Sequence, residues 1–408
     1  MSTKQIAKKP WTFMVYMAGD NSLNRAAPAD LSEMKKIGSS DKLNIIAQVD
    51  RATGGHTCQR YYLRKSTSLG ADSVAKLGEI DTGNPKNLLD FISWTERTYP
   101  ADRYALVLWN HGSGWDDTDV YANERYRSLR RITGRARHAF FRTSLRRTME
   151  KAKKDRTARA ILYDDNAKDF IDNRELTTVL ASAAKLNKRK LDLLGMDACL
   201  MSMIEVGSEI SPSVEYTVGS EETEPTEGWP YKAILSHLAQ SPATSSRAFA
   251  SAIVDDYLAS YAPSDGVTYS ACDLSKTDGL VQALSSLSHA LSAQLGDASL
   301  KQKLMAVRAR VQHYYEADNV DLVDLCTLLA EAVADTDLAA RCAAVTAAVK
   351  SNYVFANGSK GDDVRHSNGV AIYFPTGTVS PLYAGLAFSK KTGWDKFLEA
   401  YLSAIRSR

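Results

Sequence analysis

The sequence predicts an α/β/α sandwich with a mostly parallel central sheet, followed by a helical C-terminal subdomain. Two observations support this fold class. Across the first half of the chain, short apolar runs of strand length alternate with amphipathic stretches of helix length, which is typical of a helix-flanked sheet. From residue 246 the chain becomes rich in Ala, Leu and Ser at helical spacing, and this pattern indicates a helical region.

The expected strands are continuous apolar runs, as in parallel strands that are buried on both faces. They cover residues 13–17, 44–49, 104–109, 160–163, 191–196 and 216–218. The expected helices are amphipathic, with Asn or Ser placed as N-caps. They cover residues 22–37, 84–98, 173–186 and 201–210.

The expected domain organisation follows from this change in composition and periodicity. With 408 residues, of which 44% are hydrophobic, the chain can bury one large core or two moderate ones. We expect residues 1–245 to form the α/β core and residues 246–350 to form a helical subdomain or insertion. Residues 351–408 are expected to supply a return strand at 370–374 and a final helix that pack on the core.

Composition excludes several classes of protein. The longest apolar runs are far shorter than the roughly 18 residues of a membrane span, so no membrane partner is expected. The first ten residues carry lysines but no apolar signal segment, which predicts a cytoplasmic location. The five cysteines are widely spaced and odd in number, which argues against a disulfide framework and against a Cys-x-x-Cys metal site.

Charge is distributed unevenly along the chain. Residues 124–159 hold eleven arginines and three lysines against three acidic residues, a net charge of +11, whereas the whole chain carries +3 and the remainder therefore −8. A basic segment in an otherwise acidic protein is suited to binding nucleic acid or an acidic regulatory partner. A series of proteolytic cleavage sites is an equally good interpretation of the same residues.

The first chemically informative motif is Leu106-Val-Leu-Trp-Asn-His-Gly-Ser-Gly-Trp115. His111 comes at the carboxyl end of a predicted buried strand, where parallel sheets place their functional sites. Gly112 allows a sharp turn there, so that its N–H can face a substrate carbonyl. The alternative is a turn histidine without a chemical role.

The second motif is Leu191-Asp-Leu-Leu-Gly-Met-Asp-Ala-Cys-Leu-Met201. Here another predicted strand ends at Met196, and the chain presents Asp197 and Cys199 before a predicted helix. A helix N-terminus lowers the pKa of a nearby thiol and favours the nucleophilic thiolate. The alternative for Cys199 is a small buried residue between strand and helix.

Together with three further segments, these motifs resemble the clostripain-like peptidases, relatives of caspases, gingipains and legumains. The resemblance covers most of the chain, in the order of residues 11–23, 110–115, 196–201, 219–231 and 368–375. It implies a caspase-like fold and a cysteine endopeptidase that cleaves proteins after arginine or lysine.

The resemblance also implies roles for particular residues. The catalytic dyad corresponds to His111 and Cys199, and the oxyanion hole to the backbone N–H groups of Gly112 and Cys199. Asp197 matches the acid at the base of the pocket for the substrate residue before the cut. A second pocket acid is expected in the loop at 219–229, with Glu227 as first choice and Glu224 as second. No cofactor is assigned, although some relatives require Ca²⁺.

In the same family, a loop between the histidine and cysteine segments is expected to be cleaved when the zymogen is activated. Residues 124–159 lie at this place, but the segment is longer and denser in arginine than the family pattern. This departure leaves the cleavage position open and leaves room for a docking role.

Asp116, Asp117 and Asp119 follow the histidine motif. Carboxylate oxygens so close together are suited to Ca²⁺, but no complete ligand loop accompanies them. A solvated acidic turn is the preferred interpretation; no metal is assigned, and Ca²⁺ stays open as an alternative.

Two alternatives to an endopeptidase remain from the sequence. One is a non-catalytic nucleic-acid-binding or scaffold protein on a peptidase fold, using the arginine-rich segment for phosphates. Few aromatic residues accompany those arginines, which disfavours base stacking. The other is the same dyad acting on a non-protein amide or in transpeptidation.

Overall fold

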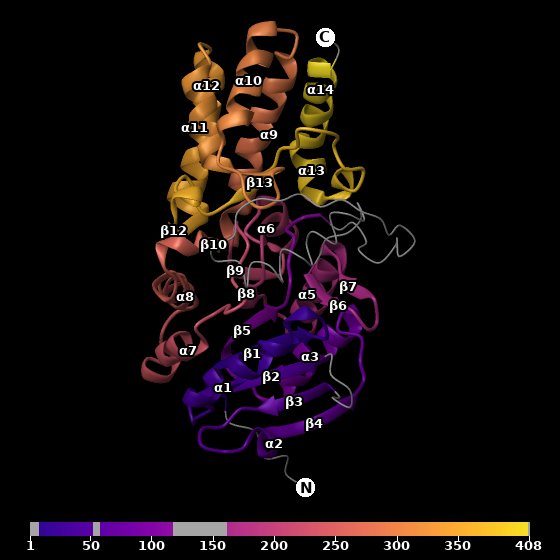
Figure 1. Cartoon of the computed structure of the whole chain (residues 1–408), viewed down its shortest axis with the longest axis vertical. Helices are drawn as coiled ribbons and strands as arrows, with labels where there is room; N and C mark the ends of the chain where they lie inside the picture. Colours follow the sequence, from indigo (N-terminus) through magenta and orange to yellow (C-terminus); the bar gives the residue numbers. More distant parts are fainter. Residues whose placement is uncertain (1–7, 52–57, 117–160, 407–408) are drawn as a thin grey trace. The chain divides into compact units, whose positions relative to one another are not determined.

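The computed structural model confirms a mostly parallel sheet flanked by helices, together with a helical C-terminal region (Figure 1). It describes residues 8–51, 58–116 and 161–406. Within these residues, no helix combines the length and the apolar character that crossing a bilayer would require.

The chain divides into two compact units, which are described separately. Unit 1 comprises Met1–Ala198 and Glu224–Ser245. Unit 2 comprises Cys199–Thr223 and Ser246–Arg408. The three domain ranges expected from the sequence are a different division of the chain, and they stay a prediction.

The sheet of unit 1 has the strand order β8-β5-β1-β2-β3-β4. These strands are β1 (Lys9–Gly19), β2 (Leu43–Arg51), β3 (Cys58–Tyr62), β4 (Ser73–Gly78), β5 (Ala101–Trp109) and β8 (Leu191–Asp197). β1 runs parallel to β2 and β5, and β5 runs parallel to β8. β3 pairs antiparallel with β2 and β4. The sequence analysis did not find β3 and β4, because partly exposed residues interrupt the buried ones in β3 and no residue of β4 is buried, so that no continuous apolar run results.

Four helices of unit 1 pack on this sheet. They are α1 (Ala27–Ile37), α3 (Pro85–Thr98), α5 (Asn173–Asn187) and α7 (Tyr231–Gln240). The connection through α1 crosses the sheet in one direction, and the connections through α3 and α5 cross it in the opposite direction. Because such crossovers are right-handed, α1 lies on one face of the sheet and α3 and α5 lie on the other. Accordingly, α3 packs against α5, and α1 packs against α7.

One strand prediction is wrong in its pairing. Residues 160–163 were expected in the parallel sheet, but β6 (Ile161–Asp164) pairs antiparallel with β7 (Asp169–Ile171) in a separate two-stranded sheet. The strand expected at 370–374 is present as β13 (Ala371–Tyr373), and it pairs antiparallel with β11 (Asn319–Asp321). A run of three or four apolar residues marks a strand but contains too little pattern to select its partner.

In unit 2, β10 (Val267–Asp273) pairs antiparallel with β9 (Val214–Gly219) on one side and with β12 (Val354–Lys360) on the other. All residues of β10 are buried, although this range lies within the region that was expected to be helical. The residues of β10 are apolar enough to fit either a buried strand or a buried helix.

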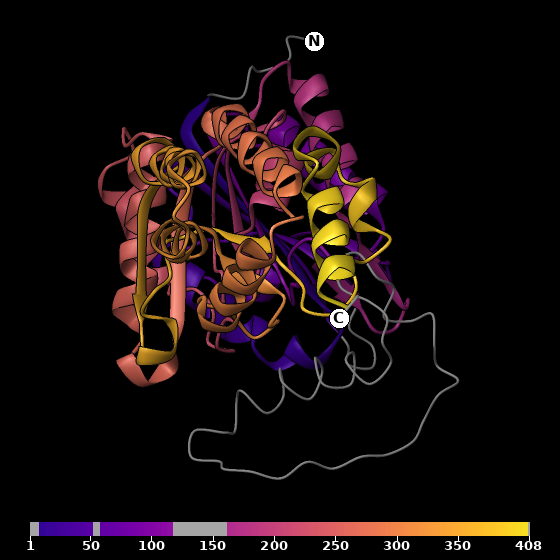
Figure 2. The same ribbon diagram turned by 90° about the horizontal axis from the view of Figure 1, so that it is seen from above.

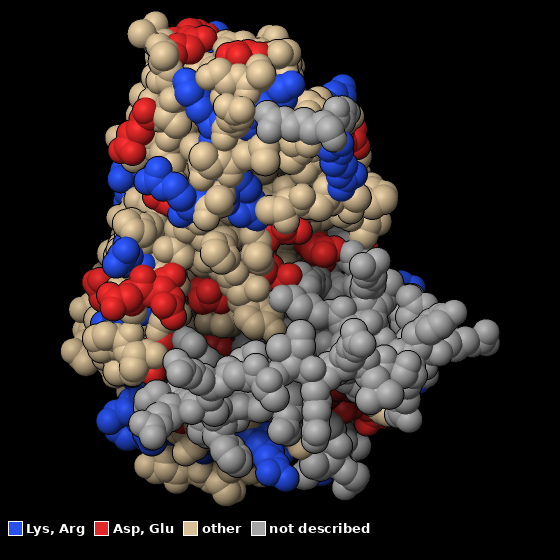
Figure 3. All heavy atoms as spheres, turned by 45° about the horizontal axis from the view of Figure 1, so that its top comes forward, with Lys and Arg blue, Asp and Glu red and all other residues tan. Residues whose placement is uncertain are grey.

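Besides these strands and the short β11 and β13, the described residues of unit 2 form helices. They are α6 (Ile204–Ile210), α8 (Ser246–Ser260), α9 (Thr277–Ala293), α10 (Ala298–Arg310), α11 (Leu322–Ala332), α12 (Thr336–Ala348), α13 (Ala387–Thr392) and α14 (Trp394–Arg406). α9 packs against α12, α13 and α14, and α11 packs against α10 and α12, so that the long helices stand side by side and several are seen nearly end-on in Figure 2. On the face drawn in Figure 3, this helical region carries basic and acidic side chains intermingled.

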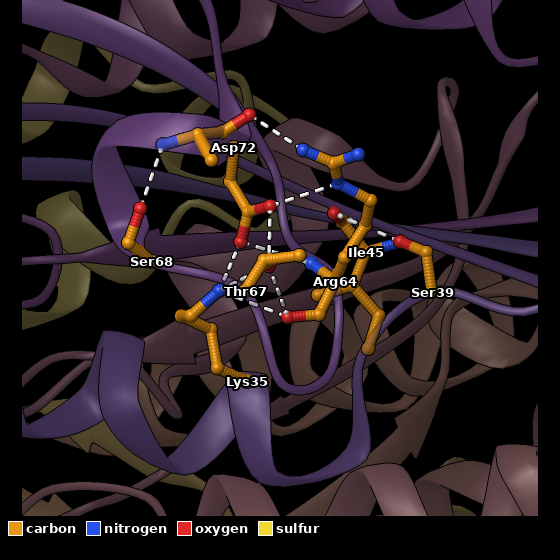
Figure 4. Close-up of polar contacts among 8 residues, drawn as sticks. Lys35, Ser39, Ile45, Arg64, Thr67, Ser68 and Asp72 are labelled. Atoms are coloured by element: carbon orange, nitrogen blue, oxygen red, sulfur yellow. Dashed lines mark hydrogen bonds and ion pairs between the residues drawn. The ribbon is translucent and has the colours of Figure 1, made fainter.

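A buried carboxylate ties the connection between β3 and β4 to α1 (Figure 4). Asp72, at the end of α2 (Leu69–Asp72), accepts hydrogen bonds from Lys35 Nζ of α1, from Thr67 Oγ1 at 2.7 Å and from Arg64 Nε at 2.9 Å. Burial raises the pKa of Asp72, but these donors lower it more, and the net pKa lies below its ordinary value. Asp72 is therefore a charged group that stabilises the folded state.

Replacing Asp72 by alanine is expected to lower the free energy of unfolding by about 3 kcal/mol, because two cations lose their buried partner. Urea denaturation measures this effect. Because the pKa of Asp72 is lowered by folding, its contribution is present above the unfolded pKa of about 3.9 and is lost as pH falls through the folded pKa. The control is Asp102→Ala, whose exposed carboxylate pairs with Lys8 and should contribute less than about 0.5 kcal/mol. Equal losses in the two variants would contradict this account.

Candidate active site

The end of β5 places His111 in a buried position beside the end of β1. His111 is 6% exposed, and its Nε2 lies 2.9 Å from the hydroxyl oxygen of Ser22. Burial lowers the pKa of His111 to about 4. At neutral pH the ring is therefore uncharged and able to accept a proton.

The residues around His111 and Ser22 are anchored to one backbone carbonyl. Because β1 and β5 are parallel and Met17 pairs with Trp109, the next residues, Ala18 and Asn110, are neighbours. The Asn110 side chain donates to the carbonyl oxygen of Ala18, and Asn21 Nδ2 donates to the same oxygen at 3.0 Å. Asn21 also caps the short 3-10 helix η1 (Ser22–Arg25) by accepting from Leu23 N. The histidine and the serine are thus held by adjoining turns.

The turn that follows His111 is buried from Gly112 to Trp115. Asn173, the first residue of α5, donates to the carbonyl oxygens of Gly114 and Trp115 at 3.2 and 3.1 Å. The left-handed backbone that requires glycine occurs at Gly114, with φ of 74°, whereas the sequence analysis assigned the sharp turn to Gly112. The role expected for the Gly112 N–H stays a prediction.

Cys199 is the first residue of unit 2, and its side chain is 3% exposed. The next residue, Leu200, has a left-handed φ of 65°, a conformation that is strained for a branched side chain and that clusters at functional sites. Its N–H donates to the carbonyl oxygen of Glu222 at 3.1 Å, which holds the strained residue in place.

The helix expected at 201–210 is α6, which begins later, at Ile204, and has seven residues. Its N-cap is Met203, so Cys199 stands further from the helix start along the chain than the sequence analysis expected.

Asp197 ends β8 and is 6% exposed. Tyr231 donates its hydroxyl proton to Asp197 Oδ2 at 2.8 Å, and the backbone N–H of Trp229 and the carboxyl group of Glu224 also bond to this carboxylate. Burial raises the pKa of Asp197 to about 6, with these three hydrogen bonds opposing the increase. Burial, followed by the charge of Asp197, raises the pKa of Glu224 well above its ordinary value. At neutral pH, Glu224 is thus the protonated partner and Asp197 the ionised one.

Gly228 is required for this arrangement. It adopts φ of +58°, and a Cβ atom at this position would lie 2.9 Å from Asp197 Oδ1. A side chain here would displace the carboxylate. The glycine that precedes Trp229 and Tyr231 therefore shapes the surroundings of Asp197, and its place in the loop is a signal that was visible in the sequence.

The structure adds Asp30, which the sequence analysis did not single out. It lies on the buried face of α1 and accepts a hydrogen bond from Trp109 Nε1 at 2.8 Å. Burial, with the charge of Asp197 as the next cause, raises the pKa of Asp30 to about 8. In the sequence, Asp30 could have been noticed as an acidic residue on the apolar face of an amphipathic helix.

The remaining predicted residues lie apart from Asp197 or outside the described residues. Glu227, the first choice in the loop, is exposed, whereas Glu224 is buried and bonds to Asp197. Asp117, Asp119 and the basic segment 124–159 fall outside the described residues. Among the residues that the structure describes, no three His, Cys, Asp or Glu side chains are arranged to hold a metal ion.

Comparison with known proteins gives consistent results. The family model described as the clostripain family matches residues 15–128 and 148–401. Clostripain of Hathewaya histolytica is 27% identical over 222 residues, which are 49% of this chain and 36% of that protein. The chain thus spans little more than a third of this curated relative.

Solved structures confirm the caspase-like fold. One is a secreted C11 cysteine protease from Bacteroides thetaiotaomicron in complex with an irreversible peptide inhibitor, with TM-score 0.64 and 19% identity over 95% of this chain and 100% of that chain. Another is an inactive zymogen C11 protease from Parabacteroides distasonis, with TM-score 0.63 and 19% identity over 95% of this chain and 99% of that one. At these identities the likeness concerns the fold.

Proposed function

This chain belongs to the clostripain family of peptidases, and we propose that it is a cysteine endopeptidase that cleaves proteins after arginine or lysine. The observation that carries the specificity is Asp197, a buried carboxylate at the end of β8 and two residues before Cys199. A buried anion beside a nucleophile selects a cationic side chain at the neighbouring substrate position.

The proposed chemistry is acyl transfer. The thiolate of Cys199 attacks the scissile carbonyl carbon, and the N–H groups of Gly112 and Cys199 stabilise the oxyanion. His111 takes the thiol proton and gives it to the leaving amine. Water then attacks the thioester carbonyl, the thiol leaves, and the acid product departs. This sequence requires no metal or cofactor.

The pocket charge follows from the hydrogen bonds of Asp197. Protonated Glu224 donates to Asp197, as Tyr231 and the N–H of Trp229 also do. Three donors hold the carboxylate in one orientation and keep it ionised in spite of burial. The pair carries a single negative charge at neutral pH, which matches one guanidinium or ammonium group.

The direct test uses fluorogenic peptides that differ only in the residue before the reporter: Arg, Lys, Gln or Leu. We expect kcat/KM for Arg and Lys to exceed that for the neutral residues by at least about 10²-fold, the value of one buried charge-assisted contact. Equal rates for all four peptides, or hydrolysis by none of them, would contradict the proposed specificity or the proposed activity, respectively.

We also propose that the enzyme is a zymogen activated by self-cleavage within residues 124–159, where the proposed specificity coincides with fourteen basic residues. Wild-type protein is expected to separate on a denaturing gel into two chains, the first ending at Arg or Lys, while Cys199→Ala stays intact. Because β5 and β8 lie on opposite sides of the cut and are paired, the two chains should elute together in size-exclusion chromatography. An active enzyme that consists of one uncut chain by intact mass would contradict activation by cleavage.

Two further expectations from the sequence remain proposals. A regulatory partner that is acidic would bind the basic segment through its arginines. A cytoplasmic location is likewise a proposal, and fractionation of the producing cells tests it.

A further inference from the structure

A hydroxyl group touches the imidazole of the proposed catalytic histidine. Ser22 Oγ lies 2.9 Å from His111 Nε2, within normal hydrogen-bonding distance. Ser22 itself is an exposed residue, so its hydroxyl contributes little to the packing of the core. The contact is therefore better explained by an effect on His111 than by a contribution to the stability of the fold.

Hydrogen bonds anchor the backbone on both sides of this contact. Ser22 begins the η1 turn that Asn21 caps, and His111 follows Asn110. The side chains of both asparagines donate to the carbonyl oxygen of Ala18. Two turns that share an anchor hold the serine and the histidine at a fixed separation, which is the geometry that a positioning residue needs.

We propose that Ser22 is a positioning residue for His111: its oxygen accepts the Nε2 proton and leaves Nδ1 as the nitrogen that exchanges a proton with Cys199 and the leaving amine. This inference rests on the proposed function. The sequence alone identified no residue that assists the dyad, and this inference assigns that role to Ser22.

The direction of the hydrogen bond follows from what the reaction demands. If Ser22 donated to Nε2, the neutral ring would carry its proton on Nδ1 and could not accept another there. If Ser22 accepts from Nε2–H, Nδ1 keeps a lone pair in the neutral ring. Protonation of Nδ1 then leaves the bond in place and strengthens it, because its donor becomes charged.

The test compares Ser22→Thr with Ser22→Val, which have the same shape but differ in the hydroxyl group. With an Arg peptide, Ser22→Val is expected to lower kcat about tenfold with KM within about twofold, because the effect falls on proton transfer rather than on binding. Ser22→Thr is expected to retain kcat within about threefold. Ser68→Ala, which removes a hydroxyl that caps α2 in the same unit, should leave kcat unchanged.

A spectroscopic measurement separates positioning from a structural role. In the Cys199→Ala background, nitrogen chemical shifts of the His111 ring should show the Nε2–H tautomer when Ser22 is retained and also in Ser22→Thr. In Ser22→Val the same shifts should show a mixture of tautomers. Equal kcat for the two substitutions at Ser22, or the Nε2–H tautomer in all three proteins, would overturn the inference.

The same experiments distinguish failure of this inference from failure of the proposed function. If His111→Ala is inactive while Ser22→Val matches wild type in kcat and tautomer, the function stands and only the role of Ser22 is lost. If His111→Ala retains wild-type activity, the proposed function fails first, and the role of Ser22 fails with it.

Discussion

Replacing Cys199 by alanine is expected to abolish peptide hydrolysis, with a loss in kcat of about 10⁴-fold or more, because the nucleophile that forms the thioester is removed. His111→Ala should cause a loss of similar size, since the thiol and the leaving amine both depend on the imidazole for proton transfer. The losses in the double variant should not add, because the two residues act as a unit. Fluorogenic peptide hydrolysis measures all three variants.

The matched control is a cysteine whose thiol cannot serve as a nucleophile. Cys272, in β10, is buried, and burial raises the pKa of its thiol to about 12, so that almost no thiolate exists at neutral pH. Cys272→Ala should therefore retain kcat within about twofold. Thermal unfolding of each variant shows whether the fold is intact. Hydrolysis by folded Cys199→Ala at a substantial fraction of the wild-type rate would remove Cys199 from its assigned role.

Replacing Asp197 by asparagine is expected to lower kcat/KM about 10²-fold for peptides with Arg or Lys before the cut, and only a few-fold for neutral residues. The substitution removes the charge but keeps the shape, so the loss should follow the charge of the substrate. Because the pKa of Asp197 is raised to about 6, wild-type preference for basic residues should also decline as pH falls through about 6 and the carboxylate becomes protonated. Measurements of kcat/KM against pH with paired Arg and Gln peptides report this decline.

Two variants of the neighbouring loop serve as comparisons for Asp197→Asn. Glu227→Gln alters an exposed acid and should leave the ratio of Arg to Gln cleavage unchanged. Glu224→Leu removes a donor to Asp197 and should raise the pKa of Asp197, which moves the decline in preference to higher pH. An equal loss for basic and neutral peptides in Asp197→Asn would instead assign Asp197 a structural role beside Cys199.

The strands that carry the proposed dyad were predictable because their signal is local. β5 is buried from Tyr104 to its end and β8 from Asp192 to its end, and a parallel strand that is covered on both faces is predominantly apolar. The polar residues that interrupt each run therefore marked the strand ends, and with them the positions of His111 and Asp197.

Other parts of the fold lacked such a signal. Partly exposed residues interrupt the buried ones in β3, no residue of β4 is buried, and β6 is too short for its partner to be inferred from its own residues. Which strands pair depends on backbone hydrogen bonds between them, and the sequence of a single strand contains no signal for these bonds.

The acidic loop after β9 shows the same limit at the proposed site. Glu224 and Glu227 are chemically alike and three positions apart, and the sequence favoured Glu227. Folding buries Glu224 against Asp197 and exposes Glu227. The selection depends on the turn at Gly228, whose left-handed backbone and missing side chain admit the Asp197 carboxylate.

By itself, the sequence determined the fold class, the family and the identity of the candidate nucleophile and base, because these depend on short segments whose residues are contiguous. Only the tertiary structure decided which glutamate bonds to Asp197, that Asp30 is buried near it, and that Ser22 touches His111. Each of these contacts joins side chains from elements far apart in the chain. Their burial and pKa values arise from neighbours that only the packed sheet and its turns bring together.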